Sequence, residues 1–481
     1  MNRTARRLAA ATLLTAIGGS ALSIATGGPA AALGCSYKVT GNIVSNNNQL
    51  ELSSTTEIDG TGVDALESNA PVAGAQIRLQ ASIGSAVPYL TQVESTTGPD
   101  GEFSMMFEEL LFCDKERFKI DVKLSSDELV VGGGGWLTVV EESNATHAPG
   151  TTAFGNVGFS ESGTGDGDDT DDRLAAETWI AVRRAMDYLD GEGVGFSQKI
   201  TINTSYNNVL VPDDREASYS DPIFGNTSNI FVDDSKNLGT ILHEIGHLWA
   251  YGRTTGEDCL LGEFLNNLEF DVHDPVEPAC VAFHEGFASY FSDRLGWELV
   301  QAGELRDGDG VVTIDLPYPS AFNRFTLNNA TSDSDLGRFS SAANLTSTSV
   351  AQTNEWGWTQ ALRVLGQKLI RFQSFGTASS SPGGQFVVSS IGAASGSSPS
   401  ISAVGSGPIV SAPCTKTAPA GLQLDDVLTV VSGMSTSSPT FSSFYSRADS
   451  RLSGFSSTDA TNFRDFANPA STVEPSARYC A

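Results

Sequence analysis

The sequence has 481 residues, of which 40% are hydrophobic, and this is enough to fill the cores of at least two domains. Acidic residues outnumber basic ones by 57 to 28, which gives a formal net charge of −29. A surface of this charge repels phosphate backbones, which argues against nucleic acid as a partner.

The N-terminal residues 1–32 have the pattern of an export signal. Arg3, Arg6 and Arg7 precede an apolar run, and small residues near Ala30–Ala32 suit cleavage. The run is too rich in alanine and glycine for a membrane span, and the adjacent arginines are consistent with a twin-arginine route. We therefore expect a protein that is secreted or resides in the periplasm or at the cell surface, without a membrane span.

Residues 33–142 have the pattern of β-structure. The stretches AQIRLQ (Ala75–Gln80) and RFKIDVKL (Arg117–Leu124) alternate apolar and polar residues, as strands with one buried face do. The sequence PVAGAQIRLQ followed by STTGPDGEFSM resembles the strand, turn and strand pattern of the transthyretin-like, carboxypeptidase-regulatory type of β-sandwich. That resemblance implies a domain that accompanies another one and has a structural or binding role.

Residues 143–172 are expected to form a linker. The run ESGTGDGDDTDD (Glu161–Asp172) is acidic and rich in glycine, and it has no apolar residue to bury. Ca²⁺ binding is an alternative for this run, although its spacing lacks the pattern of a calcium loop. The character of the chain changes at Arg173, where the third segment, 173–481, begins.

This third segment contains both helical and strand patterns. A helix is predicted from Arg173 to Gly191, because apolar residues recur there at near-helical spacing. The Ser/Gly-rich run 376–413 is expected to be an extended loop. The stretches KITINTSY and SNIFV (Ser228–Val232) indicate strands, and further helices are predicted at 237–252, 280–296, 355–372 and 422–431.

Six cysteines in an exported chain predict disulfide bonds. Their spacing favours sequential pairs, each within one segment, and the absence of a Cys-x-x-Cys pair argues against a thiolate metal site or a redox motif. The sequential pairs are Cys35–Cys113, Cys259–Cys280 and Cys414–Cys480.

The strongest motif is LHEIGHLW, which contains His243, Glu244 and His247. Residues four apart lie one turn up the same face of a helix, and two imidazoles placed in this way can reach one tetrahedral Zn²⁺ ion. Glu244 lies beside that face, next to the position of a water ligand. The rest of the helix surface is apolar, and polar groups in such a core need a binding partner. The alternative is a pair of satisfied core or surface histidines.

Zinc requires a third protein ligand. In one large group of zinc enzymes the motif continues to a glycine and a third histidine, but here Ala250 and Arg253 occupy those positions. The stretch CVAFHEGFASYFSDRLG (Cys280–Gly296) instead predicts a second helix that has an apolar side and carries Glu285 among small residues. Other candidates for the third ligand are His273, Asp274 and His284.

Taken together, LHEIGH and HEGFASYF resemble the gluzincin peptidases, the thermolysin-like and aminopeptidase-like zinc enzymes. Their ligand helix reads Asn-Glu-Gly-Phe-Ala or similar, and His284 replaces the Asn here. The resemblance implies that His243, His247 and Glu285 bind one catalytic Zn²⁺ ion and that Glu244 is the general base.

Two departures from the gluzincin pattern concern the surroundings of the zinc. The interval between the two motifs is longer than in the best-known members, and it contains Cys259 and Cys280, whose disulfide could hold the two ligand helices together. Thermolysin-like enzymes also have an Asp four residues after the ligand Glu, where this chain has Ser289, and Asp293 follows one turn later. Either side chain could orient a zinc-bound histidine.

The predicted architecture is an α+β multidomain protein, with an N-terminal β-sandwich followed by a zincin-like catalytic domain whose C-terminal half is mostly helical. The resemblance implies hydrolysis of a protein or peptide substrate, and an endopeptidase is favoured because no element that grips a free N-terminus is visible. SNIFV could pair with an extended substrate as an edge strand, or could equally be a plain core strand. Candidate oxyanion donors are Tyr290, Tyr318, Tyr445 and His273.

Two other hypotheses account for the same residues. The chain could be a catalytically inactive surface binding or adhesion protein in which the β-sandwich is the working part. Glu244 argues against this reading, because zinc binding alone would not need it. Hydrolysis of a non-peptide bond at the same site is the third hypothesis, and it is less consistent with the family resemblance.

Overall fold

A computed structural model shows that the chain is an α+β protein. The export signal predicted for residues 1–32 lies outside the described part of the chain. The structure describes residues 34–45, 50, 65–83, 88–109, 113, 115–143, 145–159, 169–204, 219–220, 229–231, 238–255, 278–305, 324–327, 358, 362, 384–390, 400–404, 410–411, 424–437 and 439–452.

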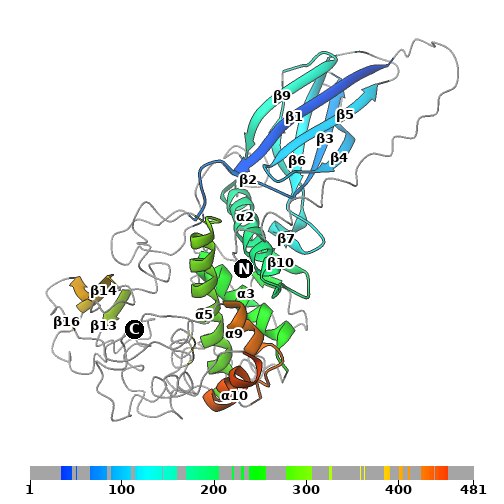
Figure 1. The fold of residues 1–481 in the computed structure, drawn as a ribbon. Helices are drawn as coiled ribbons and strands as arrows, with labels where there is room; N and C mark the ends of the chain where they lie inside the picture. Colours follow the sequence, from blue (N-terminus) through cyan, green and yellow to red (C-terminus); the bar gives the residue numbers. More distant parts are fainter. Residues whose placement is uncertain are drawn as a thin grey trace, which may run out of the picture.

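Two four-stranded sheets occupy the N-terminal third of the described chain (Figure 1). In the first, β1 lies between β5, which is antiparallel to it, and β9, which is parallel to it. In the second, the order is β4-β3-β6-β8 and all pairs are antiparallel. The strands are β1 (Cys35–Ser45), β2 (Ala70–Pro71), β3 (Gln76–Ile83), β4 (Leu90–Thr96), β5 (Glu102–Glu109), β6 (Glu116–Lys123), β8 (Leu137–Glu141) and β9 (Gly150–Gly158).

These two sheets face each other across a shared apolar core. Strand β5 alternates exposed and buried residues, as the sequence pattern of a half-buried strand requires. Tyr37 and Phe107 of the first sheet stack at 4.9 Å between ring centroids, and Phe118 of the second sheet meets them edge-on at 6.4 and 6.3 Å. A disulfide joins Cys35 to Cys113, which confirms one sequential pair. We call these strands the two-sheet unit.

The predicted linker at 143–172 is wrong at both of its ends. Strand β9 lies inside it and pairs with β1 over residues 37–44, and the next helix already begins at Asp169. The sequence GTTAFGNVG of β9 is mostly exposed and polar, so it lacks the apolar signal of a strand. Backbone hydrogen bonds to β1 hold it in place, and these depend little on side-chain type.

A third, mixed sheet has the order β11-β12-β10-β7. Strand β7 comes from the segment predicted to be the first domain, yet it pairs in parallel with β10. Strand β12 pairs with β10 on one side and with β11 on the other, so SNIFV is a core strand and not an edge strand. The strands are β7 (Leu129–Val131), β10 (Ile200–Asn203), β11 (Tyr219–Ser220) and β12 (Asn229–Phe231).

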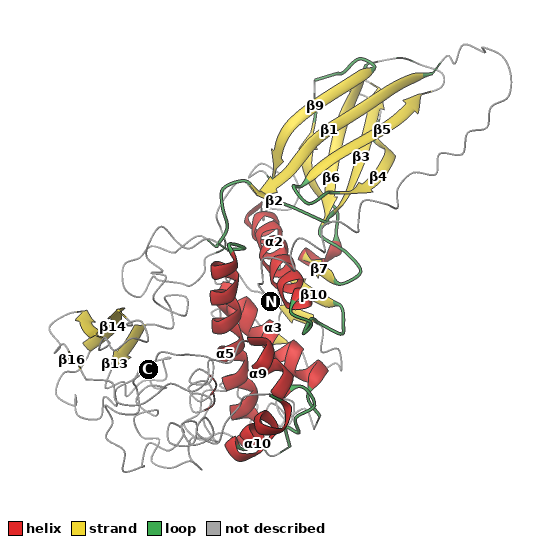
Figure 2. Ribbon diagram, viewed as in Figure 1, coloured by secondary structure: helices red, strands yellow, loops and turns green. Residues whose placement is uncertain are grey.

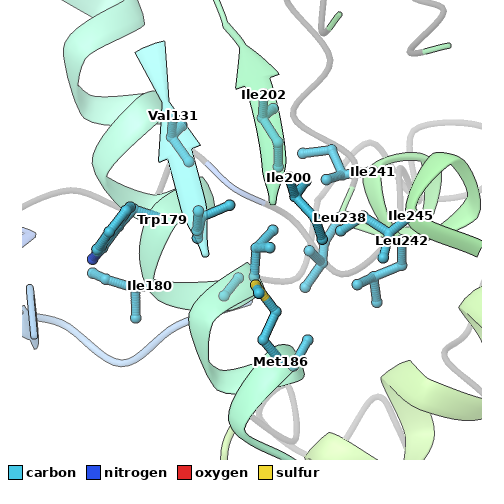
Figure 3. Close-up of a cluster of buried hydrophobic side chains, with 14 of the residues drawn as sticks. Val131, Trp179, Ile180, Met186, Ile200, Ile202, Leu238, Ile241, Leu242 and Ile245 are labelled. Carbon is cyan, nitrogen blue, oxygen red and sulfur yellow. The ribbon is translucent and has the colours of Figure 1, made fainter. Parts of the chain in front are cut away.

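Helices α2 (Asp169–Gly191) and α3 (Leu238–Arg253) pack on this mixed sheet. Figure 3 shows Val131 of β7 and Ile202 of β10 in the same cluster as Trp179 of α2 and Ile241 of α3. Helix α2 also bonds to the two-sheet unit, because buried Glu177 accepts hydrogen bonds from Ser45 Oγ at 2.8 Å and from the Leu50 amide at 2.6 Å.

Helix α5 (Ala279–Ala302) packs along α3, and α9 (Leu424–Val431) and α10 (Phe441–Arg451) complete the helical part (Figure 2). The predicted helices at 237–252, 280–296 and 422–431 are thereby confirmed. In the predicted helix 355–372 only Trp358 and Leu362 are described, and both are buried. Within the described residues no helix is both long and apolar enough to cross a membrane.

The C-terminal Ser/Gly-rich run contains strands, so the extended loop predicted at 376–413 is wrong there. A fourth sheet has the order β13-β14-β15-β16. The stretches QFVVSS and SISAV pair antiparallel within it, and their small residues are compatible with strands although they lack strong alternation. The strands are β13 (Arg324–Leu327), β14 (Gly384–Ser390), β15 (Ser400–Val404) and β16 (Val410–Ser411).

Candidate metal centre

The site is built where α3 and α5 approach each other closely. A Cβ atom added at Gly246 of α3 would lie 3.0 Å from the Ala288 Cα atom and 3.1 Å from the Phe291 Cδ1 atom of α5. Such a distance leaves no room for a side chain, so the glycine permits the contact. Ser292 Oγ of α5 also donates to the Gly239 carbonyl of α3 at 2.5 Å. These contacts fix the register of the two helices.

That register brings His243 and His247 of α3 against Glu285 of α5. The two Nε2 atoms lie 3.1 Å apart, and Glu285 Oε2 lies 3.1 Å from His243 Nε2 and 3.4 Å from His247 Nε2. One ligand atom from each residue therefore meets at a single point, and the three residues could hold a metal ion. The structure thus brings together the three residues that were predicted as ligands, including Glu285, which follows His247 by 38 residues.

The three distances match the geometry of a small tetrahedral ion. Tetrahedral zinc with ligand distances of 2.0–2.1 Å separates its ligand atoms by about 3.3–3.4 Å. Burial acts to raise the pKa of Glu285, but His247 and His243 beside it hold that pKa well below its usual range. The cluster therefore offers an ionised carboxylate and two imidazoles, which is a donor set that binds zinc.

A hydroxyl group orients one of the ligands. Ser289 Oγ lies 3.3 Å from His243 Nδ1, so the ring can donate its Nδ1 proton to the hydroxyl and leave the Nε2 lone pair for a metal. Ser289 is one of the two residues predicted for this role, and the side chain of the other, Asp293, lies outside the described part. The side chain of His243 is 23% exposed, whereas that of His247 is 3% exposed, so solvent reaches the cluster on the His243 side.

The remaining predicted residues occupy different places. Glu244, the predicted general base, is buried on α3 next to His243. Tyr290 is buried in α5 and Tyr445 is partly buried on α10. The competing ligands His273 and Asp274, and the oxyanion candidate Tyr318, lie outside the described residues.

His284 is described, but it does not belong to the ligand cluster. Its ring stacks on Tyr251 with centroids 5.0 Å apart, and burial followed by the nearby His247 lowers its pKa to about 3. His284 is therefore uncharged at neutral pH. Tyr251 was not among the predicted site residues, although its place four residues after His247 puts it on the same face of α3.

A buried ion pair anchors the far end of α5. Arg294 Nε donates to Glu298 Oε1 at 2.7 Å, and both side chains are less than 8% exposed. The Tyr188 hydroxyl of α2 donates to Glu298 Oε2 at 2.7 Å, and the Leu424 amide at the start of α9 donates to Oε1 at 3.3 Å. Because three helices meet at one carboxylate, α5 is fixed relative to α2 and α9. Cys280 near its N-terminus is disulfide-bonded, with a partner outside the described residues.

Comparison with known proteins identifies no family. No protein-family model matches the chain, and no curated protein matches it. Among solved structures, a 9R-lipoxygenase from Cyanothece PCC8801 is similar at 12% sequence identity and a TM-score of 0.15, over 34% of this chain and 25% of that chain. The chain thus spans about a quarter of that protein, and a score this low identifies no shared fold. The function of the present chain is therefore inferred from its own residues.

Proposed function

We propose that this chain is an exported zinc-dependent peptidase of the gluzincin type, with a transthyretin-like β-sandwich before a zincin-like catalytic domain. The observation that carries the proposal is the ligand triangle, in which two imidazole nitrogens and one carboxylate oxygen from two helices lie 3.1–3.4 Å apart. The HExxH motif and the HEGFA stretch, whose resemblance to gluzincins suggested these three residues, support it independently of the distances.

The donor set favours zinc over other divalent ions. Two neutral imidazoles and one carboxylate form the three-ligand set of known catalytic zinc sites, which keep a fourth position for water. Magnesium and calcium prefer oxygen ligands and higher coordination numbers. When bound, zinc lowers the pKa of a water molecule to about 7 and polarises a carbonyl group.

Residues of the chain would bind the metal ion, orient one ligand and transfer the proton. His243 and His247 would bind the metal ion through Nε2. Ser289 orients the ring of His243, because its hydroxyl oxygen accepts a hydrogen bond from the Nδ1–H group. Glu244, buried one position after His243, would take the proton from the attacking water and pass it to the leaving amine. The exposed edge of His243 marks the side from which a peptide would enter. We favour an endopeptidase because no group that binds a free N-terminus is apparent.

A broad peptide library read by mass spectrometry tests this function. We expect the wild type to cut peptide bonds and Glu244→Gln to lose about 10²–10⁴ of the rate while keeping its zinc. Glu94→Gln on the exposed strand β4 is the matched control and should cut like the wild type. Zinc content is measured on the same samples. If the zinc-loaded wild type cuts nothing, the peptidase proposal is wrong, and the chain would be an inactive binding protein or a hydrolase of another bond.

A further inference from the structure

The rings of Tyr251 and His284 lie next to the ligand triangle, which is formed by His243, His247 and Glu285. Tyr251 follows His247 by one helical turn, and their ring centroids are 6.3 Å apart with the planes inclined by 24°. Tyr251 also stacks on His284, with ring centroids 5.0 Å apart and planes inclined by 26°. His284 immediately precedes Glu285 on α5. The stack therefore runs from a ligand on α3 to the residue adjacent to the ligand on α5.

His284 contributes a buried flat ring to this stack. Its side chain is 1% exposed, and Phe283 packs edge-on against it with centroids 5.5 Å apart. Its Nδ1 atom is buried and has no hydrogen-bond partner among the described residues. A buried polar atom without a partner is unfavourable, so an apolar ring of similar size would serve packing equally well. What the stack requires of His284 is a flat ring at this position.

We propose that Tyr251 and His284 form a positioning pair that fixes the ring of His247 and thereby sets the metal affinity of the centre. The inference rests on the proposed function only in requiring that the ligand triangle binds a metal ion. The two histidine ligands are then oriented in different ways. His243 is held through a hydroxyl at its Nδ1 atom, whereas His247 is held through the face of an aromatic ring.

The physical reason lies in the geometry of imidazole binding. A metal ion lies in the plane of the ring that binds it, so rotation of the ring about its own side-chain axis moves the lone pair off the metal. The Tyr251 ring, inclined by 24° to His247 at 6.3 Å, restricts that rotation, and His284 in turn packs on Tyr251 at 5.0 Å. Groups that orient a metal ligand typically change metal affinity by about 10–100-fold when they are replaced.

Two kinds of substitution in the full-length protein test whether the aromatic ring or its polar atoms matter at each position. Tyr251→Leu and His284→Leu remove a ring, and each should weaken Zn²⁺ binding by about 10–100-fold in competition with a chromophoric chelator. Tyr251→Phe and His284→Phe keep a ring, and each should stay within about threefold of the wild type. The Co²⁺-substituted protein supplies a spectroscopic readout, because the visible absorption bands of the Leu variants should shift and those of the Phe variants should not.

Phe287→Leu is the matched control. It also removes an aromatic ring from the α3–α5 contact, where Phe287 packs on Trp249 with centroids 5.8 Å apart and on Phe283 at 6.1 Å, while the described residues show no ring contact between Phe287 and Tyr251 or His284. It should lower the melting temperature of the metal-free protein without changing metal affinity. The inference is overturned if the Leu variants of the stack bind zinc as tightly as the wild type, or if Phe287→Leu weakens binding equally.

These outcomes differ from those that decide the proposed function. Metal affinity is measured without any substrate, so a wild type that binds zinc but cuts no peptide refutes the peptidase and leaves the positioning pair standing. Conversely, Leu variants with unchanged affinity refute the positioning pair and leave the peptidase standing. A wild type that binds neither Zn²⁺ nor Co²⁺ would refute both.

Discussion

Gly246→Ala tests whether the close approach of α3 and α5 sets the ligand triangle. The new Cβ atom would lie 3.0 Å from Ala288 Cα and within 3.2 Å of two Phe291 atoms, whereas ordinary contacts begin at 3.4 Å. The atom in the way at Ala288 belongs to the backbone, so a rotamer change cannot relieve the contact. The helices must therefore separate by about 0.4 Å, and the 3.1 Å distance between His243 and Glu285 must grow with them.

The expected magnitudes follow from two opposing terms. Overpacking a core of this kind costs about 1–3 kcal/mol, and replacing glycine by alanine inside a helix returns about 1 kcal/mol. The free energy of unfolding of the metal-free protein should therefore fall by roughly 0–2 kcal/mol. Metal binding restores the short distance and must bear the compression, so the affinity for Zn²⁺ should drop by about 5–150-fold.

Urea unfolding of the metal-free protein and chelator competition measure the two quantities separately. Gly252→Ala on the same helix is the matched control, because its Cβ would meet only Ser197 Oγ at 3.4 Å and Gln198 atoms at 3.9 Å. It should stabilise the protein slightly and leave zinc affinity unchanged. If Gly246→Ala binds zinc as tightly as the wild type, the separation of the helices does not control the site, and the reasoning fails.

Three further predictions concern other parts of the chain. Ser289→Ala should weaken Zn²⁺ binding about tenfold, and Ser289→Asp should restore it, as measured by chelator competition, because the Nδ1 proton of His243 needs an acceptor. A chain that starts at Asp169 should show no cooperative unfolding in calorimetry, because it lacks β7 and uncovers the edge of β10; a sharp transition would contradict the pairing. Asp190 lies near the C-terminus of α2, where burial and, to a lesser extent, the negative charge of Glu128 raise the pKa of its carboxyl group. When the pH is above this raised pKa, the negative charge of Asp190 destabilises the folded state. Asp190→Asn should therefore raise the urea midpoint slightly at about pH 7, and the gain should vanish at about pH 3, below the ordinary value, where both states are protonated.

Local signals in the sequence predicted most of the elements that carry the site. The helices around the HExxH and HEGFA motifs are long and rich in apolar residues, and strand β5 alternates exposed and buried residues, so these elements were predicted correctly. Strand β9 was missed because it is rich in glycine and threonine, and β14 and β15 were missed because their short apolar runs lie among serine and glycine residues. Such strands form because their backbone groups pair with neighbouring strands, and this pairing cannot be read from the local sequence.

For the site, the HExxH spacing and the resemblance of two short motifs to the gluzincins predicted the three residues that the structure brings together, but not the residues that surround them. Tyr251 and Gly246 were overlooked because their importance depends on what lies opposite them on α5, which no local pattern reveals. The contact of Ser289 Oγ with His243 Nδ1 likewise depends on the crossing of the two helices, and the side chain of Asp293, the other candidate, lies outside the described part.

The domain boundary predicted at residue 142 separates parts of the chain that the structure joins. Strand β7 leaves the two-sheet unit to become one edge of the mixed sheet, and α3 packs on that same sheet (Figure 3). Glu177 of α2 bonds to Ser45 across a separation of 132 residues. Because an added module would make few contacts of this kind, the two-sheet unit is part of the scaffold that supports α3. Val131→Ala, which opens a cavity in the cluster that Val131 shares with α3, should therefore lower the melting temperature of the part of the chain that carries α3.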